Sequence, residues 1–247
     1  MIASSSWTHV GMVRKNNEDY CQIVNLPDDV CLFLVADGIG GNAGGEIASQ
    51  VAVHKVAETL SSTEISDIKS CRSHVSHAIE LAHQAVLEKA EREPDMAGMG
   101  TTLTMMVIKE DRGLVAHVGD SRAYHYHDGK MSRITDDHSL TEEWVRDGKI
   151  TPEEAAFHPY RNVLTRAVGI EPFEKPDFVP IHLQSGDRVL ICTDGLTNMV
   201  DDRRLEEILK LNLDPQTLSE RLGQEALNEG GHDNVTMIVV DWAGKKD

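Results

Sequence analysis

Four aspartates lie at the ends of predicted strands, which suggests that they share one site. Asp37 follows the apolar run LFLVA, Asp120 follows LVAHVG and Asp194 follows RVLICT, whereas Asp233 comes just before VTMIVVDW. In an antiparallel sheet the end of one strand lies beside the start of its neighbour, so all four can meet at one edge. Each is flanked by Gly or Asn, which lets backbone carbonyls and water come close.

Four carboxylates gathered in one place repel one another unless divalent cations neutralise them. Oxygen ligands without Cys or His at ligand spacing select hard ions, so Mg²⁺ or Mn²⁺ is expected. An aspartate before glycine also makes an ordinary turn, and that explanation is better for any one of the four. Because it does not explain all four at strand ends, the sequence predicts a metal centre.

The glycine-rich segment after Asp37, GIGGNAGG, could instead be a nucleotide cradle. The Walker form needs Lys and then Ser or Thr after its last glycine, but Glu46 and Ile47 follow here. The dinucleotide form is nearly present, in Gly38, Gly40 and Ala43. It also needs a second parallel strand, and the sequence continues as a predicted helix. The glycines are better explained as room for the backbone to approach a metal.

Alternating and continuous apolar runs predict the elements that position these residues. Strands are expected near Cys21–Asn25, Val30–Ala36, Thr101–Lys109, Leu114–Val118, Arg122–His127, Phe178–Leu183, Arg188–Thr193 and Val235–Trp242. Helices are expected near Gly45–Leu60, Ser66–Glu93, Leu140–Asp147, Asp202–Leu211 and Pro215–Glu229. Two helix-capping patterns, Ser139-x-x-Glu142 and Thr151-Pro152-x-Glu154, mark the middle region.

Most connections between the expected strands are too short for a crossover helix, which excludes a parallel doubly wound sheet. We interpret GDSR (119–122) as a hairpin turn between two strands. The pattern predicts an α+β fold in which two antiparallel sheets pack together with helices on the outer faces. No repeat or long linker divides the chain, so residues 1–247 are expected to form a single domain.

Composition limits the partners and the compartment. The net charge of -17 argues against nucleic acid or an anionic membrane as a partner. The four cysteines form no CxxC pair, as is typical of free thiols in a reducing compartment. The N-terminal segment MIASSSWTHV lacks a hydrophobic signal core, and no apolar run approaches about 18 residues. We expect a soluble, cytoplasmic protein, and a monomer.

Six ordered segments resemble the signature of the metal-dependent (type 2C) serine/threonine protein phosphatases, most closely their bacterial branch. They are RKNNED (14–19), VADGIGG (35–41), GTTL (100–103), HVGDSRAY (117–124), CTDGLTNMV (192–200) and GGHDNVT (230–236). The resemblance spans the chain from about Thr8 to Trp242. It implies a four-layer α/β/β/α sandwich with helix pairs outside and a binuclear Mn²⁺/Mg²⁺ centre at one end.

The resemblance also implies roles for individual residues. Asp37 should bridge two metals, with the carbonyl of Gly38 facing the second. Asp194 and Asp233 should hold the first metal. Two adjacent acids, Glu18 and Asp19, should contact the second metal directly or through water, and the sequence leaves open which one does so.

Two further roles follow from the resemblance. Arg14 should bind the substrate phosphate, because its planar guanidinium offers two donors to phosphate oxygens. Asp120, together with Asp194, should hold a third and weaker metal. The implied reaction hydrolyses phosphoserine and phosphothreonine through a water or hydroxide shared by two cations, without a covalent intermediate. No cysteine is followed six positions later by arginine, which excludes a cysteine phosphatase.

The chain departs from many eukaryotic members at two positions. Ile39 replaces a histidine proposed to protonate the leaving oxygen, so water or another histidine must do so. Asn198 replaces an aspartate, so the third metal should have fewer carboxylate ligands. The segment 139–169 resembles a flap beside the metal centre, where His158 or Arg161 could meet a phosphopeptide. His158-Pro159 could equally be only a turn.

Two other functions remain open at this stage. The same centre would attack any accessible phosphomonoester, so a small-molecule phosphatase is one alternative. A non-catalytic phosphoprotein-binding protein is the other, but it would be expected to have lost a metal carboxylate or Arg14. The resemblance implies phosphorylated proteins as partners, and a Ser/Thr kinase as the enzyme opposed. His125 and His127 share one strand face, with Asp136, Asp137 and His138 beyond the next turn. A zinc site there is conceivable but less favoured, because the sequence alone does not fix its geometry.

Overall fold

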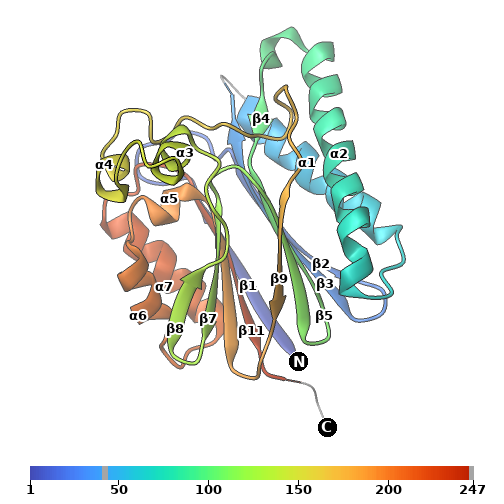
Figure 1. Ribbon diagram of the computed structural model, residues 1–247, viewed down its shortest axis with the longest axis vertical. Helices are drawn as coiled ribbons and strands as arrows, with labels where there is room; N and C mark the ends of the chain where they lie inside the picture. Colours follow the sequence, from blue (N-terminus) through green and yellow to red (C-terminus); the bar gives the residue numbers. More distant parts are fainter. Residues whose placement is uncertain (41–43, 245–247) are drawn as a thin grey trace.

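A computed structural model describes residues 1–40 and 44–244. Two antiparallel sheets face each other (Figure 1). The first has the order β1 (Ile2–His9), β11 (Val235–Trp242), β10 (Asp187–Cys192), β7 (Arg122–His127) and β8 (Lys130–Arg133). The second has the order β2 (Asp19–Leu26), β3 (Val30–Ile39), β5 (Leu103–Lys109), β6 (Arg112–Val118) and β9 (Asp177–His182), and β4 (Gly100–Thr101) pairs with β3.

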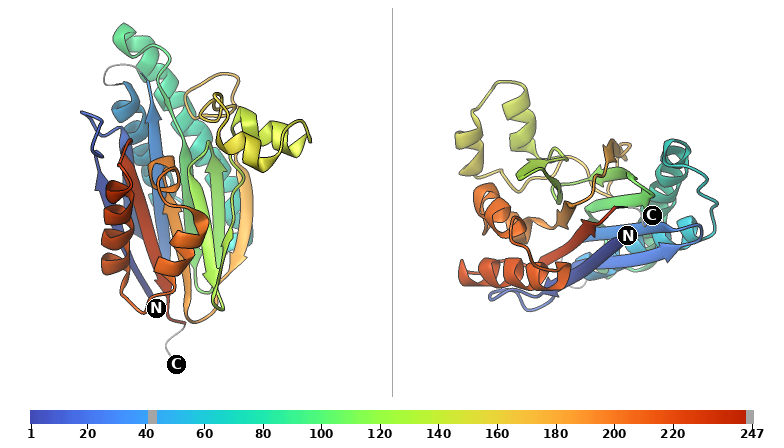
Figure 2. Two further views of the ribbon diagram at one scale, coloured as in Figure 1. Left: turned by 90° about the vertical axis from the view of Figure 1, so that its left-hand side faces the viewer. Right: turned by 90° about the horizontal axis from the view of Figure 1, so that it is seen from below.

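Helices cover the outer faces of both sheets (Figures 1 and 2). The long helices α1 (Gly44–Ser61) and α2 (Ile68–Arg92) pack on the second sheet, and a short 3-10 turn, η1 (Pro94–Met96), follows them. Helices α6 (Asp202–Leu209) and α7 (Pro215–Asn228) lie against the first sheet. The predicted four-layer α+β sandwich is confirmed. None of the described helices is long and apolar enough to cross a membrane.

Apolar strand residues divide between the layers by alternation. In β3, Leu32 and Leu34 pack with the α1–α2 layer, whereas Phe33 and Val35 join the core between the two sheets. Because successive side chains point to opposite faces, a strand buried on both faces is a continuous apolar run. This explains why LFLVA was recognisable as a strand, and why it delivers Asp37 to the edge of the sandwich.

The structure adds elements that the sequence patterns did not predict. Strand β1 has the sequence IASSSWTH and lies at a sheet edge, where only alternate residues are partly buried. Strand β8 is short and polar, and α5 (Asp194–Thr197) is a single helical turn. None of the three has a long apolar run, so periodicity could not reveal them.

The hairpin prediction at GDSR is wrong. Strand β6 belongs to the second sheet and β7 to the first, so this turn crosses between the sheets. Gly119, with φ of +115°, packs so tightly against Thr102 that an added Cβ would lie 2.5 Å from its methyl group. A short turn between two apolar runs looks the same in sequence whether the strands pair or change sheets.

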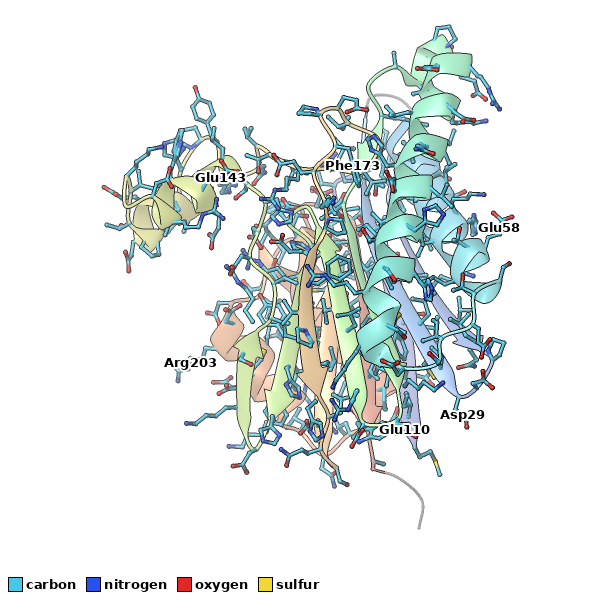
Figure 3. The ribbon with its side chains drawn as sticks, turned by 45° about the vertical axis from the view of Figure 1, so that its right-hand side comes forward. Asp29, Glu58, Glu110, Glu143, Phe173 and Arg203 are labelled. Carbon is cyan, nitrogen blue, oxygen red and sulfur yellow. The ribbon has the colours of Figure 1, made fainter. Side chains whose placement is uncertain are left out.

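The flap segment, residues 139–169, contains α3 (Leu140–Arg146) and α4 (Pro152–Ala156) and stands beside the body of the protein (Figure 3). The capping box at Thr151 and Glu154 is confirmed. Ser139 caps α3, but the Glu142 carboxylate pairs with Arg133 at 2.8 Å instead of completing a box. Gly41 and Ala43 of the glycine-rich segment, and residues 245–247, lie outside the described residues.

Candidate metal centre

Two carboxylates are paired on neighbouring strands of the second sheet. Asp19 opens β2 and lies directly opposite Asp37 near the end of β3. Like charges opposite each other on one sheet destabilise the pairing unless something neutralises them. Burial, and then the charges of Asp19, Asp194 and other nearby aspartates, raise the pKa of Asp37 well above its usual value.

The other three predicted aspartates lie at the same end of the sandwich. Asp194 begins α5 directly after β10, Asp233 precedes β11, and Asp120 follows β6. Together with Asp37 and Arg14 they line one hollow of about 390 Å³. Burial raises the pKa of Asp120, and the charge of Asp194 raises it further. Burial also raises the pKa of Asp194, and there the next cause is the charge of Asp233. The predicted convergence of four aspartates is therefore present.

A threonine pair holds the backbone of Asp37. The Asp37 N–H donates to Thr102 Oγ1 at 2.9 Å, and its carbonyl accepts from the Thr101 hydroxyl at 2.8 Å. Thr102 Oγ1 also lies 2.7 Å from Ser121 Oγ, in the turn that carries Asp120. The GTTL segment therefore links the two aspartate-bearing turns, a role that its sequence did not reveal.

Asn234 ties the N-terminal loop to the start of β11. Its side-chain amide donates to the carbonyls of Val10 and Asn16, both at 2.9 Å, and its Oδ1 accepts from the Glu18 N–H at 2.8 Å. All these contacts are made by a side chain that is almost completely buried. Asn234 thus places Glu18 and Arg14 beside Asp233, although we had assigned it no role.

The glycines in the loop allow backbone segments to come very close together. A Cβ on Gly38 would lie 2.0 Å from the Gly45 carbonyl oxygen. A Cβ on Gly45 would lie 2.8 Å from the Gly38 carbonyl oxygen and 2.9 Å from Glu18 Oε2. The Gly38 carbonyl oxygen and Glu18 Oε2, both predicted to face the second metal, therefore lie close to the Cα of Gly45. Any larger residue at position 45 would collide with them.

Asp19 is the carboxylate that most clearly lacks a partner. Thr193 donates to its Oδ2 at 2.9 Å, but its buried Oδ1 has no hydrogen-bond partner among the described residues. Burial raises the pKa of Asp19 to about 7, against the hydrogen bonds from Thr236 and Thr193, which lower it. A buried carboxylate oxygen without a partner, in a cluster of six acids, suits hard divalent cations. The donor set therefore fits Mn²⁺ or Mg²⁺.

Arg14 contacts one of the candidate ligands. Its Nη2 donates to Asp233 Oδ2 at 2.7 Å, while its side chain remains 52% exposed. It lines the same hollow as the four aspartates. The guanidinium therefore lies beside the centre and is open to solvent on its other side.

The flap brings one of its two predicted substrate-binding residues to the centre. A larger cavity of about 960 Å³ lies between the flap and α5, and Arg161 lines it together with Asp120, Asp194 and Asp233. No side-chain hydrogen bond or ion pair of Arg161 occurs among the described residues. His158 lines neither hollow and packs edge-on against Trp144, with ring centroids 5.2 Å apart. His232 lines the larger cavity, a position that sequence reasoning missed.

His138 connects the flap to the Asp120 turn. Its Nδ1 accepts from the Gly119 N–H at 3.1 Å, and its backbone N–H donates to the Gly119 carbonyl at 2.7 Å. Its carbonyl accepts from the Thr165 N–H at the other end of the flap. Such contacts join residues far apart in sequence, so no local pattern could indicate them.

Comparisons with known proteins agree with this geometry. The family model described as Protein phosphatase 2C matches residues 12–229. Serine/threonine phosphatase stp of Listeria innocua is 36% identical over 95% of this chain and 93% of its own length. The structure of a Streptococcus agalactiae serine/threonine phosphatase is 33% identical, with a TM-score of 0.93, over 98% of this chain and 99% of that one.

The chain belongs to the protein phosphatase 2C family. It is a protein phosphatase. A third relative, the catalytic domain of PstP, was solved in complex with two manganese ions; it is 34% identical, with a TM-score of 0.86, over 97% of each chain. The expected type of cofactor, Mn²⁺ or Mg²⁺, is confirmed. The contribution of each ligand and the third ion stay predictions.

Replacing Asp37 by Asn should show separately how the Asp37 charge affects stability without metal and how it contributes to metal binding. Without metal, Asp37→Asn should unfold at the same temperature as the wild type or higher, because one buried charge is gone. Mn²⁺ at about 100 times its Kd should raise the wild-type midpoint by roughly 5–10 °C. The variant should lose most of this shift and nearly all activity. Thermal unfolding with EDTA or Mn²⁺ measures both effects.

The exposed aspartate Asp95, on the 3-10 turn, provides the matched control. Asp95→Asn should show the full wild-type response to Mn²⁺. An equal Mn²⁺ shift in Asp37→Asn and the wild type would show that Asp37 does not bind the metals.

Proposed function

We propose that this protein hydrolyses phosphoserine and phosphothreonine in proteins, using two Mn²⁺ or Mg²⁺ ions, and that it opposes a Ser/Thr kinase in the cytoplasm as a monomer. The observation that carries the proposal is the cluster of Asp37, Asp120, Asp194 and Asp233 with Arg14 around one hollow. The net charge of -17 supports a partner other than nucleic acid or an anionic membrane.

The residues of the chain divide the work as follows. Asp37, Asp194 and Asp233 would hold the ions, and the Gly38 carbonyl with Glu18 or Asp19, directly or through water, would complete the oxygen ligands. The ions, when bound, supply charge neutralisation and lower the pKa of a water molecule. Arg14, whose side chain contacts Asp233 and is 52% exposed, would hold the phosphate by charge-assisted hydrogen bonds.

The exit of the leaving group needs a proton. Ile39 lines the hollow where many eukaryotic members have histidine, and it cannot donate one. His232 lines the adjoining cavity beside Asp233. It is the histidine of the described residues best placed to serve, and a water held by Asp120 is the alternative.

The size of the site favours protein substrates over small ones. The cavity of about 960 Å³ extends from the carboxylates to the flap residues Phe157 and Arg161. A phosphorylated side chain can reach the centre while its backbone lies along the flap. We propose that Arg161 contacts the phosphopeptide there. His158 packs against Trp144 and lines neither hollow, so we assign it no contact with the phosphate.

The proposed activity is tested by turnover on matched substrates. With Mn²⁺, a phosphothreonine peptide should be hydrolysed with a kcat/KM at least about tenfold above that of a sugar phosphate, because only the peptide fills the cavity. Exhaustive EDTA treatment should abolish both activities, since carboxylate sites exchange these ions. Equal efficiency on both substrates would favour the small-molecule phosphatase. Peptide binding without turnover in Mn²⁺ would favour the non-catalytic alternative.

Arg14→Ala should lower kcat/KM on the phosphopeptide by roughly tenfold or more, from the loss of a charge-assisted pair. If the arginine binds the ground state, KM rises; if it acts in the transition state, kcat falls. The adjacent and exposed Lys15 provides the control, and Lys15→Ala should retain nearly full efficiency. An unchanged kcat/KM for Arg14→Ala would place Arg14 outside the reaction.

Asp120→Ala should separate the third ion from the other two. We expect the protein to keep two ions, and phosphopeptide turnover to fall by roughly tenfold or more, the scale of losing a general acid. An aryl phosphate with a better leaving group should be affected less. Metal counting and kinetics on both substrates measure these effects. Asp136, whose side chain is 85% exposed, gives the control variant Asp136→Ala.

Two results would contradict this division of roles. One is loss of the two core ions in Asp120→Ala. The other is an equal loss of rate on both substrates.

A further inference from the structure

Two histidines and an aspartate meet at the end of the first sheet that is remote from the carboxylate centre. His125 and His127 lie two residues apart on β7, so their side chains share one face of the strand. Asp187 begins the neighbouring strand β10, where Arg188 pairs with Tyr126. Asp187 is therefore opposite His127. The sequence had made this pair of histidines conceivable as ligands, and the structure supplies the third group.

The geometry of this cluster is compact. His125 Nε2 lies 2.8 Å from Asp187 Oδ2, and His127 Nδ1 lies 2.7 Å from Asp187 Oδ1. The three ligand atoms all lie within 4.8 Å of one another. The Gln184 N–H holds the carboxylate in place with a 2.8 Å hydrogen bond to Oδ2. Each imidazole thus directs one ring nitrogen at a separate oxygen of a fixed carboxylate, which keeps the three groups together.

In this cluster the aspartate is buried, whereas the histidines are partly exposed to solvent. The Asp187 side chain is 3% exposed, that of His125 17% and that of His127 43%. The pre-oriented carboxylate and the two imidazoles thus offer three ligand atoms to a cation that enters past the more exposed His127.

We propose that His125, His127 and Asp187 form a second metal site, selective for a transition-metal ion such as Zn²⁺. Imidazole nitrogen favours Zn²⁺ and its neighbours in the first transition row over Mg²⁺ or Mn²⁺, which prefer oxygen. Three protein ligands leave a fourth position for water, as in exchangeable zinc sites. The ion cross-links β7 and β10 and leaves the distant carboxylate centre its own Mn²⁺ or Mg²⁺.

The two sites occupy opposite ends of the same two strands. Asp120 precedes β7 and Asp194 follows β10, whereas His127 ends β7 and Asp187 begins β10. An ion at the histidine end therefore stabilises the strand pair without occupying the cleft. This separation allows the two kinds of ion to be titrated independently.

Co²⁺ serves as a spectroscopic substitute for Zn²⁺, because the visible absorption of four-coordinate Co²⁺ is intense. The protein background is Asp37→Asn in millimolar Mg²⁺, which removes the carboxylate centre as a competitor. We expect one equivalent of Co²⁺ to bind with this absorption, and Zn²⁺ to displace it. Addition of His127→Gln should weaken binding by about 100-fold or more, since loss of even a supporting group costs 10–100-fold.

Two further variants complete the test. His77→Gln alters an exposed histidine on α2 and should leave Co²⁺ uptake unchanged. Asp187→Asn keeps the hydrogen bond from Gln184 but loses the anion, and it should weaken uptake like His127→Gln. In the otherwise wild-type chain, His127→Gln should retain Mn²⁺-dependent turnover, which shows that it folds. The proposal is overturned if the Asp37→Asn protein takes up no Co²⁺, or if His127→Gln and Asp187→Asn take it up as tightly as their parent.

Discussion

The mutual repulsion of buried carboxylates is the constraint on which the rest of this structure depends. Asp19 and Asp37 are opposite each other in one sheet, and Asp120, Asp194 and Asp233 approach from the ends of other strands. The pKa values of Asp19, Asp37, Asp120 and Asp194 are raised mainly by burial and further by the charges of neighbouring aspartates. Such a cluster is unstable by itself, and divalent cations turn the same repulsion into affinity. The fold therefore holds in place a site that only metal completes.

Neutral hydrogen bonds hold this charged group together. Thr101, Thr102 and Ser121 fix the Asp37 and Asp120 turns, and Asn234 fixes the loop that carries Glu18 and Arg14. None of these side chains adds charge, so they do not compete with the cations for the carboxylates. Glycines at 38, 45 and 195 bring the backbone segments closer than any side chain would allow. The positions of the carboxylates at the centre are thus determined by the surrounding groups as well as by the ligands themselves.

The sequence predicted those features that are local or that follow from alternation. The continuous apolar run of β3 identified a strand buried on both faces, and the aspartates at strand ends identified the centre. Pairings between distant residues were not predictable in this way. Whether GDSR joined two paired strands or two sheets depended on packing of Gly119 against Thr102, and His138 reaches the Asp120 turn from 19 residues away. Strand β1 was not predicted because it lies at a sheet edge, where a strand needs few apolar residues.

Ligand chemistry also explains how one small domain can keep two kinds of ion apart. The cluster of Asp37, Asp120, Asp194 and Asp233 offers carboxylate oxygens, while the far ends of β7 and β10 offer two imidazoles and one carboxylate. Affinity for divalent ions generally increases from Mn²⁺ to Zn²⁺ whatever the ligands, so carboxylates alone could not exclude the tighter-binding metal. A nitrogen-containing site on the same strands gives such an ion a better place to bind. The two ends of the same strands therefore differ in the kind of ion that their ligands favour.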